Sequence, residues 1–202
     1  MKHWITAVAL AACAPLALAQ AVVGQPAPAF AATDTAGRSV KLSDFKGRHV
    51  VLEWLNPGCP YVQKHYGAGN MQATQKAAAD QGVVWLAVNT TARDHADYQP
   101  PTQLAAWMKG QKAAATTTLM DSDGTVGRAY GARTTPHLYV INAAGTLVYA
   151  GAIDSKPSAN PADIPSSTNH VKAALAESLA GKPVALASTR PYGCSVKYPA
   201  SL

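Results

Sequence analysis

The spacing of apolar residues predicts a strand–helix–strand unit in the first half of this chain. Two runs of strand length are almost continuously apolar, VVLEWL at Val50–Leu55 and VVWLAVN at Val83–Asn89. Such runs are typical of strands buried on both faces of a sheet. The segment between them, from Cys59 to a stop at Gly82, has helical character with a glycine-rich interruption before Asn70. The pattern therefore predicts a βαβ unit at the centre of an α/β domain.

Weaker patterns predict further elements on both sides of this unit. Turn residues around Gly37 favour a hairpin, and the next residues favour a helical turn that ends at Gly47. Later segments predict a helix over 101–113, a strand and turn over 116–124, a short helix ending at Gly131, a hairpin over 135–153 and a helix over 167–181. Residues 154–167 contain three prolines and are expected to form a loop.

The N-terminus has the features of an export signal. After a short positive start, an apolar stretch covers Trp4–Leu18, and the residues at 17–19 fit the small-residue pattern of a cleavage site. We therefore expect a signal peptide over 1–19, cleaved after Ala19, and a periplasmic or secreted protein. In an alternative reading, the sequence LAAC ending at Cys13 is a lipobox, and a lipid on this cysteine would anchor the protein to a membrane.

Composition favours one globular domain and argues against a nucleic-acid partner. The chain has 202 residues, of which 48% are hydrophobic and 14% are charged, so it can bury one sizeable core. Its net charge is +6, but the basic residues are scattered and form no run of the kind that binds nucleic acid. We expect one domain over 22–181 and a C-terminal extension over 182–202.

Two cysteines are the candidate reactive groups. Removal of the signal peptide would leave Cys59 and Cys194, in a compartment where disulfides persist. Cys59 precedes Pro60 at the expected start of a helix, and the positive end of the helix dipole lowers a thiol pKa. We therefore favour a reactive, exposed Cys59. For Cys194 three alternatives stay open: reversible pairing with Cys59, a permanent disulfide, and no pairing.

The order of these elements, with a cysteine at the first strand-to-helix junction, resembles the thioredoxin fold. The sequence VVLEWLNPGCPYV at 50–62 aligns without gaps with VVLNFWASWCPPC, a pattern of membrane-facing thioredoxin relatives. The segments VGQPAPAF, LSDFKGR and TTPHLYVINAAG are similar to the redoxin branch, which includes the alkyl hydroperoxide reductase and thiol-specific antioxidant proteins. The resemblance implies a thioredoxin-like α/β fold: a central mixed sheet flanked by helices, an N-terminal hairpin extension and a long C-terminal tail.

The same resemblance implies roles for individual residues. Cys59 matches the nucleophile of the family's C-x-x-C motif, whereas Val62 stands where the second cysteine would be. Thr135 and Pro136 match the cis-proline segment that faces the nucleophile, beside which relatives bind substrate chain as an added strand. Glu53 matches a buried acid, whose pKa burial would raise and which would then accept a proton near the cysteine. In the alternative for Glu53, its carboxylate reaches a surface lysine.

Three functions compete. The resemblance implies a thiol–disulfide oxidoreductase whose partners are protein or small-molecule thiols and disulfides and an unidentified thiol reductant, with no cofactor. The first alternative is a peroxiredoxin that reduces peroxides. Peroxiredoxins resemble one another in the pattern P-x-x-x-[TS]-x-x-C and an arginine, but Leu52, Asn56 and Pro136 stand at those places here, and Arg133 is out of register. The second alternative is a non-catalytic binding protein with a structural disulfide.

Two histidines lie near the expected site in the sequence. His65 follows Cys59 on the helix and His137 follows Pro136, so either imidazole could help to stabilise a thiolate. A lone histidine is more often a packing or surface residue. Together with Cys59 they show no recognised metal-ligand spacing, so we expect no metal site.

Overall fold

A mixed seven-stranded sheet forms the centre of the protein. The computed structural model describes residues 20–200, so the expected signal peptide and Cys13 lie outside the described residues. The strands are β1 (Ala31–Asp34), β2 (Ser39–Lys41), β3 (Val50–Trp54), β4 (Val84–Asn89), β5 (Thr117–Met120), β7 (His137–Ile141) and β8 (Leu147–Gly151), in the order β2-β1-β5-β4-β3-β7-β8. β3 pairs in parallel with β4, and β4 with β5, while the other pairs are antiparallel.

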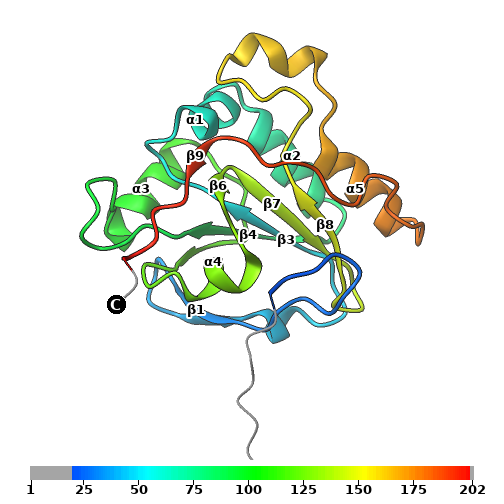
Figure 1. Ribbon diagram of the computed structural model, residues 1–202, viewed down its shortest axis with the longest axis horizontal. Helices are drawn as coiled ribbons and strands as arrows, with labels where there is room; N and C mark the ends of the chain where they lie inside the picture. The colour runs from blue at the N-terminus through cyan, green and yellow to red at the C-terminus, as the bar shows by residue number, and fades with distance from the viewer. Residues whose placement is uncertain (1–19, 201–202) are drawn as a thin grey trace, which may run out of the picture.

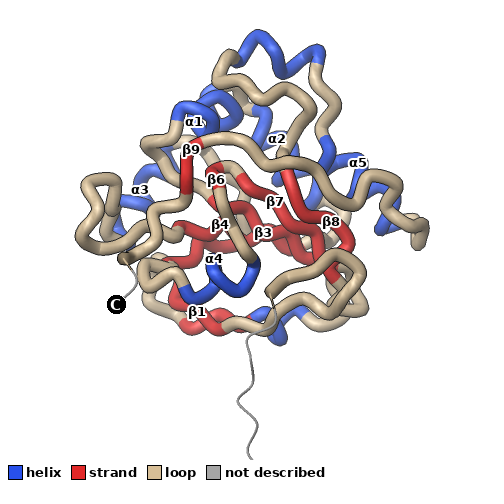
Figure 2. Tube along the Cα trace, in the orientation of Figure 1, coloured by secondary structure: helices blue, strands red, loops and turns tan. Residues whose placement is uncertain are grey.

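Helices cover both faces of this sheet (Figure 1). They are α1 (Pro60–Gly67), α2 (Asn70–Ala79), α3 (Pro101–Gly110), α4 (Thr125–Tyr130) and α5 (His170–Leu179), with two 3₁₀ helices, η1 (Leu42–Phe45) and η2 (Pro161–Ser166). Figure 2 shows the strands β3, β4 and β7 in the middle of the molecule, with α4 below them, α1 and α2 above and α5 to the right. Among residues 20–200, no helix has the length and apolar character needed to cross a bilayer.

Alternate residues of the central strands supply two separate cores. On β3, Val51 packs against α1, α2 and α5, whereas Leu52 and Trp54 face α4 and the N-terminal segment. Every residue of β3 and β4 is buried. This burial on both faces explains the continuous apolar runs in the sequence, and the thioredoxin-like α/β fold expected from the sequence is confirmed.

The hairpin expected around Gly37 is confirmed by the pairing of β1 with β2, and β1 also pairs with β5, so the hairpin extends the sheet. Two other local expectations need correction. The helix predicted over 101–113 ends at Gly110, and Lys112 takes a positive φ of 54°. Within the expected loop, η2 forms because the side chain of Asn160 caps it and Pro161 has a φ suited to the first turn.

The C-terminal extension is packed along the domain. Ser188 forms a bridge with Ala150 of β8, and β9 (Cys194–Ser195) pairs antiparallel with β6 (Thr134–Thr135). Further on, the Tyr198 hydroxyl donates to the Ala132 carbonyl at 2.7 Å. In Figure 1 this tail, drawn in red, returns from α5 across the molecule to β6. It is therefore part of the fold rather than a free arm.

Leu52 tests the burial of the central strand. Its side chain is 0% exposed on β3, so Leu52→Ala should lower the free energy of unfolding by about 2–5 kcal/mol through lost burial and a cavity. Leu186→Ala is the matched control, because Leu186 is 52% exposed and should change stability by less than about 0.5 kcal/mol. Urea unfolding measures both, and equal effects would contradict this description of the core.

Candidate active site

Cys59 lies at the start of α1, at the carboxyl end of the central strand β3. It is the N-cap residue of the helix, and Pro60 occupies the first turn. The preceding turn is held by Asn56, whose side-chain oxygen accepts the Gly58 N–H at 2.8 Å and whose carbonyl accepts the Cys59 N–H at 3.0 Å. The predicted helix start is confirmed. The expected exposure of the thiol is wrong, because Cys59 is only 2% exposed.

Cys194 supplies the second sulfur of the site. Its Sγ lies 2.6 Å from Sγ of Cys59, and both cysteines are free thiols in this structure. The contact depends on the pairing of β9 with β6, in which Cys194 is the partner of Thr135. Val62, at the place of the second cysteine in C-x-x-C, is 0% exposed in the core. The second thiol at Cys59 therefore comes from the C-terminal tail and not from α1.

The tail passes directly over the cis-proline segment. The Thr135–Pro136 peptide is cis, as expected from the resemblance, and the Thr135 carbonyl accepts a hydrogen bond from Sγ of Cys59 at 3.0 Å. Gly193 has a φ of 126°, and a Cβ there would lie 2.1 Å from the Thr135 carbonyl oxygen. Only glycine allows this close approach, which sets Cys194 above Cys59.

The two thiols have opposite pKa shifts. Burial acts to raise the pKa of Cys59, but the contacts of its sulfur with Cys194, with Thr135 and with the backbone N–H of Val62 outweigh burial and lower it. Burial and the adjacent Cys59 sulfur raise the pKa of Cys194 to about 12. The opposite shifts make Cys59 the more acidic thiol of the pair, so it is the better candidate for the nucleophile, and Cys194 is the thiol that keeps its proton.

Glu53 is fully buried in a network of hydrogen bonds. Its carboxylate accepts from the Trp85 indole N–H at 2.7 Å, the Tyr66 hydroxyl at 2.9 Å and the Gln75 amide at 3.0 Å. Burial raises its pKa to about 7, and these three hydrogen bonds oppose the rise. The expected burial and pKa shift are confirmed, and the surface-lysine alternative is wrong. No hydrogen bond joins Glu53 to Cys59 within residues 20–200, so its role as a proton acceptor stays a prediction.

Within residues 20–200, neither histidine forms a hydrogen bond with Cys59. The imidazole of His65 lies 3.4 Å from the Tyr192 hydroxyl, and that of His137 lies 3.1 Å from the Tyr139 hydroxyl. Burial lowers the pKa of His65 to about 4 and that of His137 to about 3, so both are neutral at pH 7. Across residues 20–200, no cluster of three or more histidine, cysteine or acidic side chains could hold a metal ion.

A buried polar cluster beside the cysteines was not predicted from the sequence. Lys64 of α1 lies 3.4 Å from the Asp154 carboxylate, and the Tyr192 hydroxyl donates to the other oxygen of Asp154. The side chains of Lys64 and Asp154 are at most 1% exposed. The only sequence signal was a lysine beside buried positions of a helix, and nothing in the local pattern connects it to residues so far along the chain.

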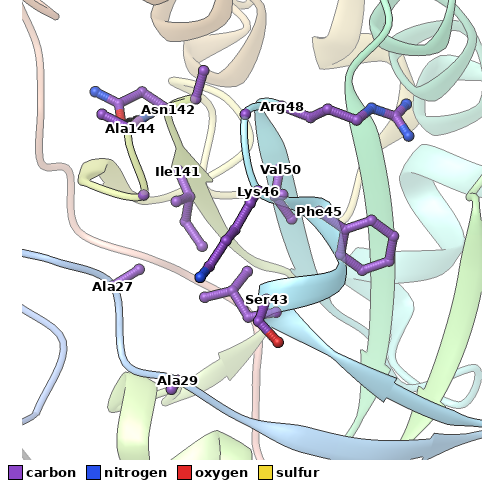
Figure 3. A pocket seen from close by; sticks show the side chains of 14 residues that line it. Ala27, Ala29, Ser43, Phe45, Lys46, Arg48, Val50, Ile141, Asn142 and Ala144 are labelled. Atoms are coloured by element: carbon purple, nitrogen blue, oxygen red, sulfur yellow. Dashed lines mark hydrogen bonds between the residues drawn. The ribbon is translucent and has the colours of Figure 1, made fainter.

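A separate apolar cavity lies at the opposite end of β3 (Figure 3). It has a volume of about 400 Å³ and is bounded by η1 and the turn of the β7–β8 hairpin. Val50, the first residue of β3, lines it, whereas Cys59 follows the last residue of that strand. Because its lining contains no cysteine, histidine or acidic residue, the cysteine pair is the better candidate for the active site.

Comparison with solved structures defines the class of protein. A hypothetical protein from Sinorhizobium meliloti 1021 has a TM-score of 0.76 and 23% identity, over 89% of this chain and 96% of that one. An uncharacterised conserved protein from Geobacillus kaustophilus has a TM-score of 0.76 and 26% identity, over 90% and 94%. A thiol:disulfide interchange protein from Bacteroides sp. has a TM-score of 0.52 and 21% identity, over 72% and 88%. These likenesses agree with the thioredoxin-like α/β fold described above.

The family follows from the sequence. Residues 23–150 match the AhpC/TSA family, which is the redoxin branch of that superfamily, and the chain belongs to it. Members of this family are in general thiol-based oxidoreductases that act on thiols and disulfides. No curated protein matches the chain.

The raised pKa of Glu53 predicts a pH dependence of stability. Below its ordinary pKa of 4.5 the carboxyl is protonated in both the folded and the unfolded states; between 4.5 and about 7 only the unfolded state loses the proton. The Glu53 carboxyl should therefore lower stability by about 3 kcal/mol across this window as pH rises, and cause no further loss above it. Glu53→Gln should remove that fall, as measured by urea unfolding at several pH values. Parallel profiles for the two proteins would argue against the buried neutral acid.

Proposed function

We propose that the protein is an exported thiol–disulfide oxidoreductase in which Cys59 is the nucleophile and Cys194 is the resolving thiol. The observation that carries this proposal is the 2.6 Å separation of the two sulfur atoms. The helix N-terminus at Cys59 and its lowered pKa support the choice of nucleophile. The cis-proline segment at Thr135 and Pro136 is the proposed binding edge for a partner's chain.

The reaction consists of two exchanges. The Cys59 thiolate attacks one sulfur of a partner disulfide, so the partner's other sulfur leaves as a thiolate and takes up a proton. Cys194 then loses its proton to solvent and attacks Sγ of Cys59, which breaks the mixed disulfide and releases the second partner thiolate. The partner gains two electrons and two protons, and the protein keeps a Cys59–Cys194 disulfide. A thiol reductant returns the protein to the dithiol by the reverse exchange.

A peroxidase reaction is the competing function within the same family. It would use Cys59 to form a sulfenic acid and Cys194 to resolve it. The residues that orient peroxide in relatives have no match here, because Pro136 holds the place of their arginine and Asn56 holds that of their threonine or serine. The hydrogen bonds of Asn56 instead hold the turn before Cys59. These features favour disulfide exchange.

Export is proposed from the sequence alone. The apolar N-terminal stretch with a cleavage site after Ala19 supports a periplasmic or secreted location. Anchoring through a lipid on Cys13 is the alternative. Mass spectrometry of the mature N-terminus distinguishes them, because only the first gives a chain that begins at Gln20.

Single cysteine variants test the proposed roles of Cys59 as nucleophile and Cys194 as resolving thiol. Cys59→Ser should abolish insulin reduction in the presence of dithiothreitol. Cys194→Ser should lower turnover by at least about tenfold, because resolution then waits for an external thiol, yet should trap one mixed disulfide per protein. Mass spectrometry measures the trapped adduct, and an adduct on Cys194 in the Cys59→Ser protein instead would reverse the assigned roles.

Peroxide is the matched comparison substrate. Stopped-flow mixing of the reduced protein with hydrogen peroxide should give sulfenic acid more slowly than the reaction with a disulfide. Fast sulfenic-acid formation with little insulin reduction would favour the peroxidase. If the wild-type protein reacts with neither peroxide nor a disulfide, a non-catalytic binding protein is supported.

A further inference from the structure

The polar cluster behind the cysteines joins the three segments that meet at the active site. Lys64 lies on α1, five residues after Cys59; Asp154 follows β8, and Tyr192 is two residues before Cys194 on the tail. Asp154 is the centre of the cluster. One of its carboxylate oxygens accepts hydrogen bonds from the Tyr192 hydroxyl and the Lys156 N–H. The other oxygen forms an ion pair with Lys64.

Burial makes these contacts strong. The Asp154 and Lys64 side chains are almost fully removed from solvent, and a hydrogen bond to a buried charged group stabilises more than one between neutral groups. The pKa of Asp154 is lowered despite its burial, with the Tyr192 hydrogen bond as the main opposing cause. Asp154 is thus a fixed anionic acceptor for the tail. The Tyr192 ring also packs edge-on against Tyr61 of α1, with centroids 5.8 Å apart.

The tail also covers the edge at which a partner's chain would bind. Cys194 occupies the backbone partner position beside Thr135, and with the tail in place Cys59 is 2% exposed. A partner disulfide reaches Cys59 only when the tail leaves, and the second exchange needs the tail to return. The position of the tail therefore affects both exchanges. The first is favoured when the tail is away from Cys59, and the second when the tail lies against it.

We propose that Tyr192 is a positioning residue for the redox reaction: its hydroxyl bond to Asp154 holds Cys194 against Cys59 and closes the edge of β6 to a partner's chain. This inference rests on the proposed function of the cysteine pair. The Tyr192–Asp154 bond should slow the first exchange by limiting access to Cys59. It should speed the second by keeping the resolving thiol near the mixed disulfide.

The two exchanges can be followed separately with 5,5′-dithiobis(2-nitrobenzoate). The Cys59 thiolate attacks this disulfide and releases one thionitrobenzoate; Cys194 then attacks the mixed disulfide on Cys59, loses its proton and releases a second. In Tyr192→Phe the first release should be about tenfold faster and the second about tenfold slower, a factor that corresponds to about 1.4 kcal/mol for the lost hydroxyl contact. Asp154→Asn should give the same pair of opposite changes.

Tyr130→Phe is the matched control, because its buried hydroxyl donates to the Pro28 carbonyl at 2.8 Å, in a different part of the fold. Both of its rates should equal those of the wild type. Unchanged rates in Tyr192→Phe, or equal acceleration of both releases as from general loosening, would overturn the positioning role while leaving the proposed function intact. Release of only one thionitrobenzoate by the wild type would overturn both, since Cys194 would then resolve nothing.

Discussion

The register of β9 against β6 is the constraint on which the active site depends. Side chains alternate between the two faces of a strand, so a slip of one residue would turn the Cys194 sulfur away from Cys59. The register is fixed by the close approach of Gly193 to the Thr135 carbonyl and by the Tyr192 contact with Asp154. Cys194, on a two-residue strand, thereby takes the place of the second cysteine of a C-x-x-C motif. Val62, which stands at that position of the motif, packs in the core.

Two buried carboxylates contribute to the site in contrasting ways. Glu53 has hydrogen-bond donors but no cation within its network, so burial dominates and keeps it largely neutral up to about pH 7. Asp154 lies beside the Lys64 ammonium and accepts from a phenol, so it stays ionised in an equally buried position. The same chemical group is thus protonated below about pH 7 in one place and ionised in the other.

The sequence was enough to predict the parts of the structure that depend on local pattern. The buried strands at 50–55 and 83–89 and the helix that begins after Cys59 were expected, because apolar runs and proline positions act on their immediate neighbours. The cis peptide at Thr135–Pro136 was expected only from the resemblance to thioredoxin-like proteins. The exposure of Cys59 was mispredicted, since its cover comes from a segment more than a hundred residues later. Lys64, Asp154 and Tyr192 were missed for the same reason: their meeting is set by tertiary packing, and no local spacing encodes it.

The central claim is that Cys59 and Cys194 form a reversible redox pair. Its most direct test is to equilibrate the purified wild-type protein in glutathione buffers of graded potential, followed by differential alkylation and mass spectrometry of both cysteines. The account predicts an intramolecular Cys59–Cys194 disulfide that interconverts with the dithiol at a potential above about −300 mV, in the range of catalytic rather than structural disulfides. Two thiols that never pair under oxidising conditions, or a disulfide that resists every buffer, would contradict it.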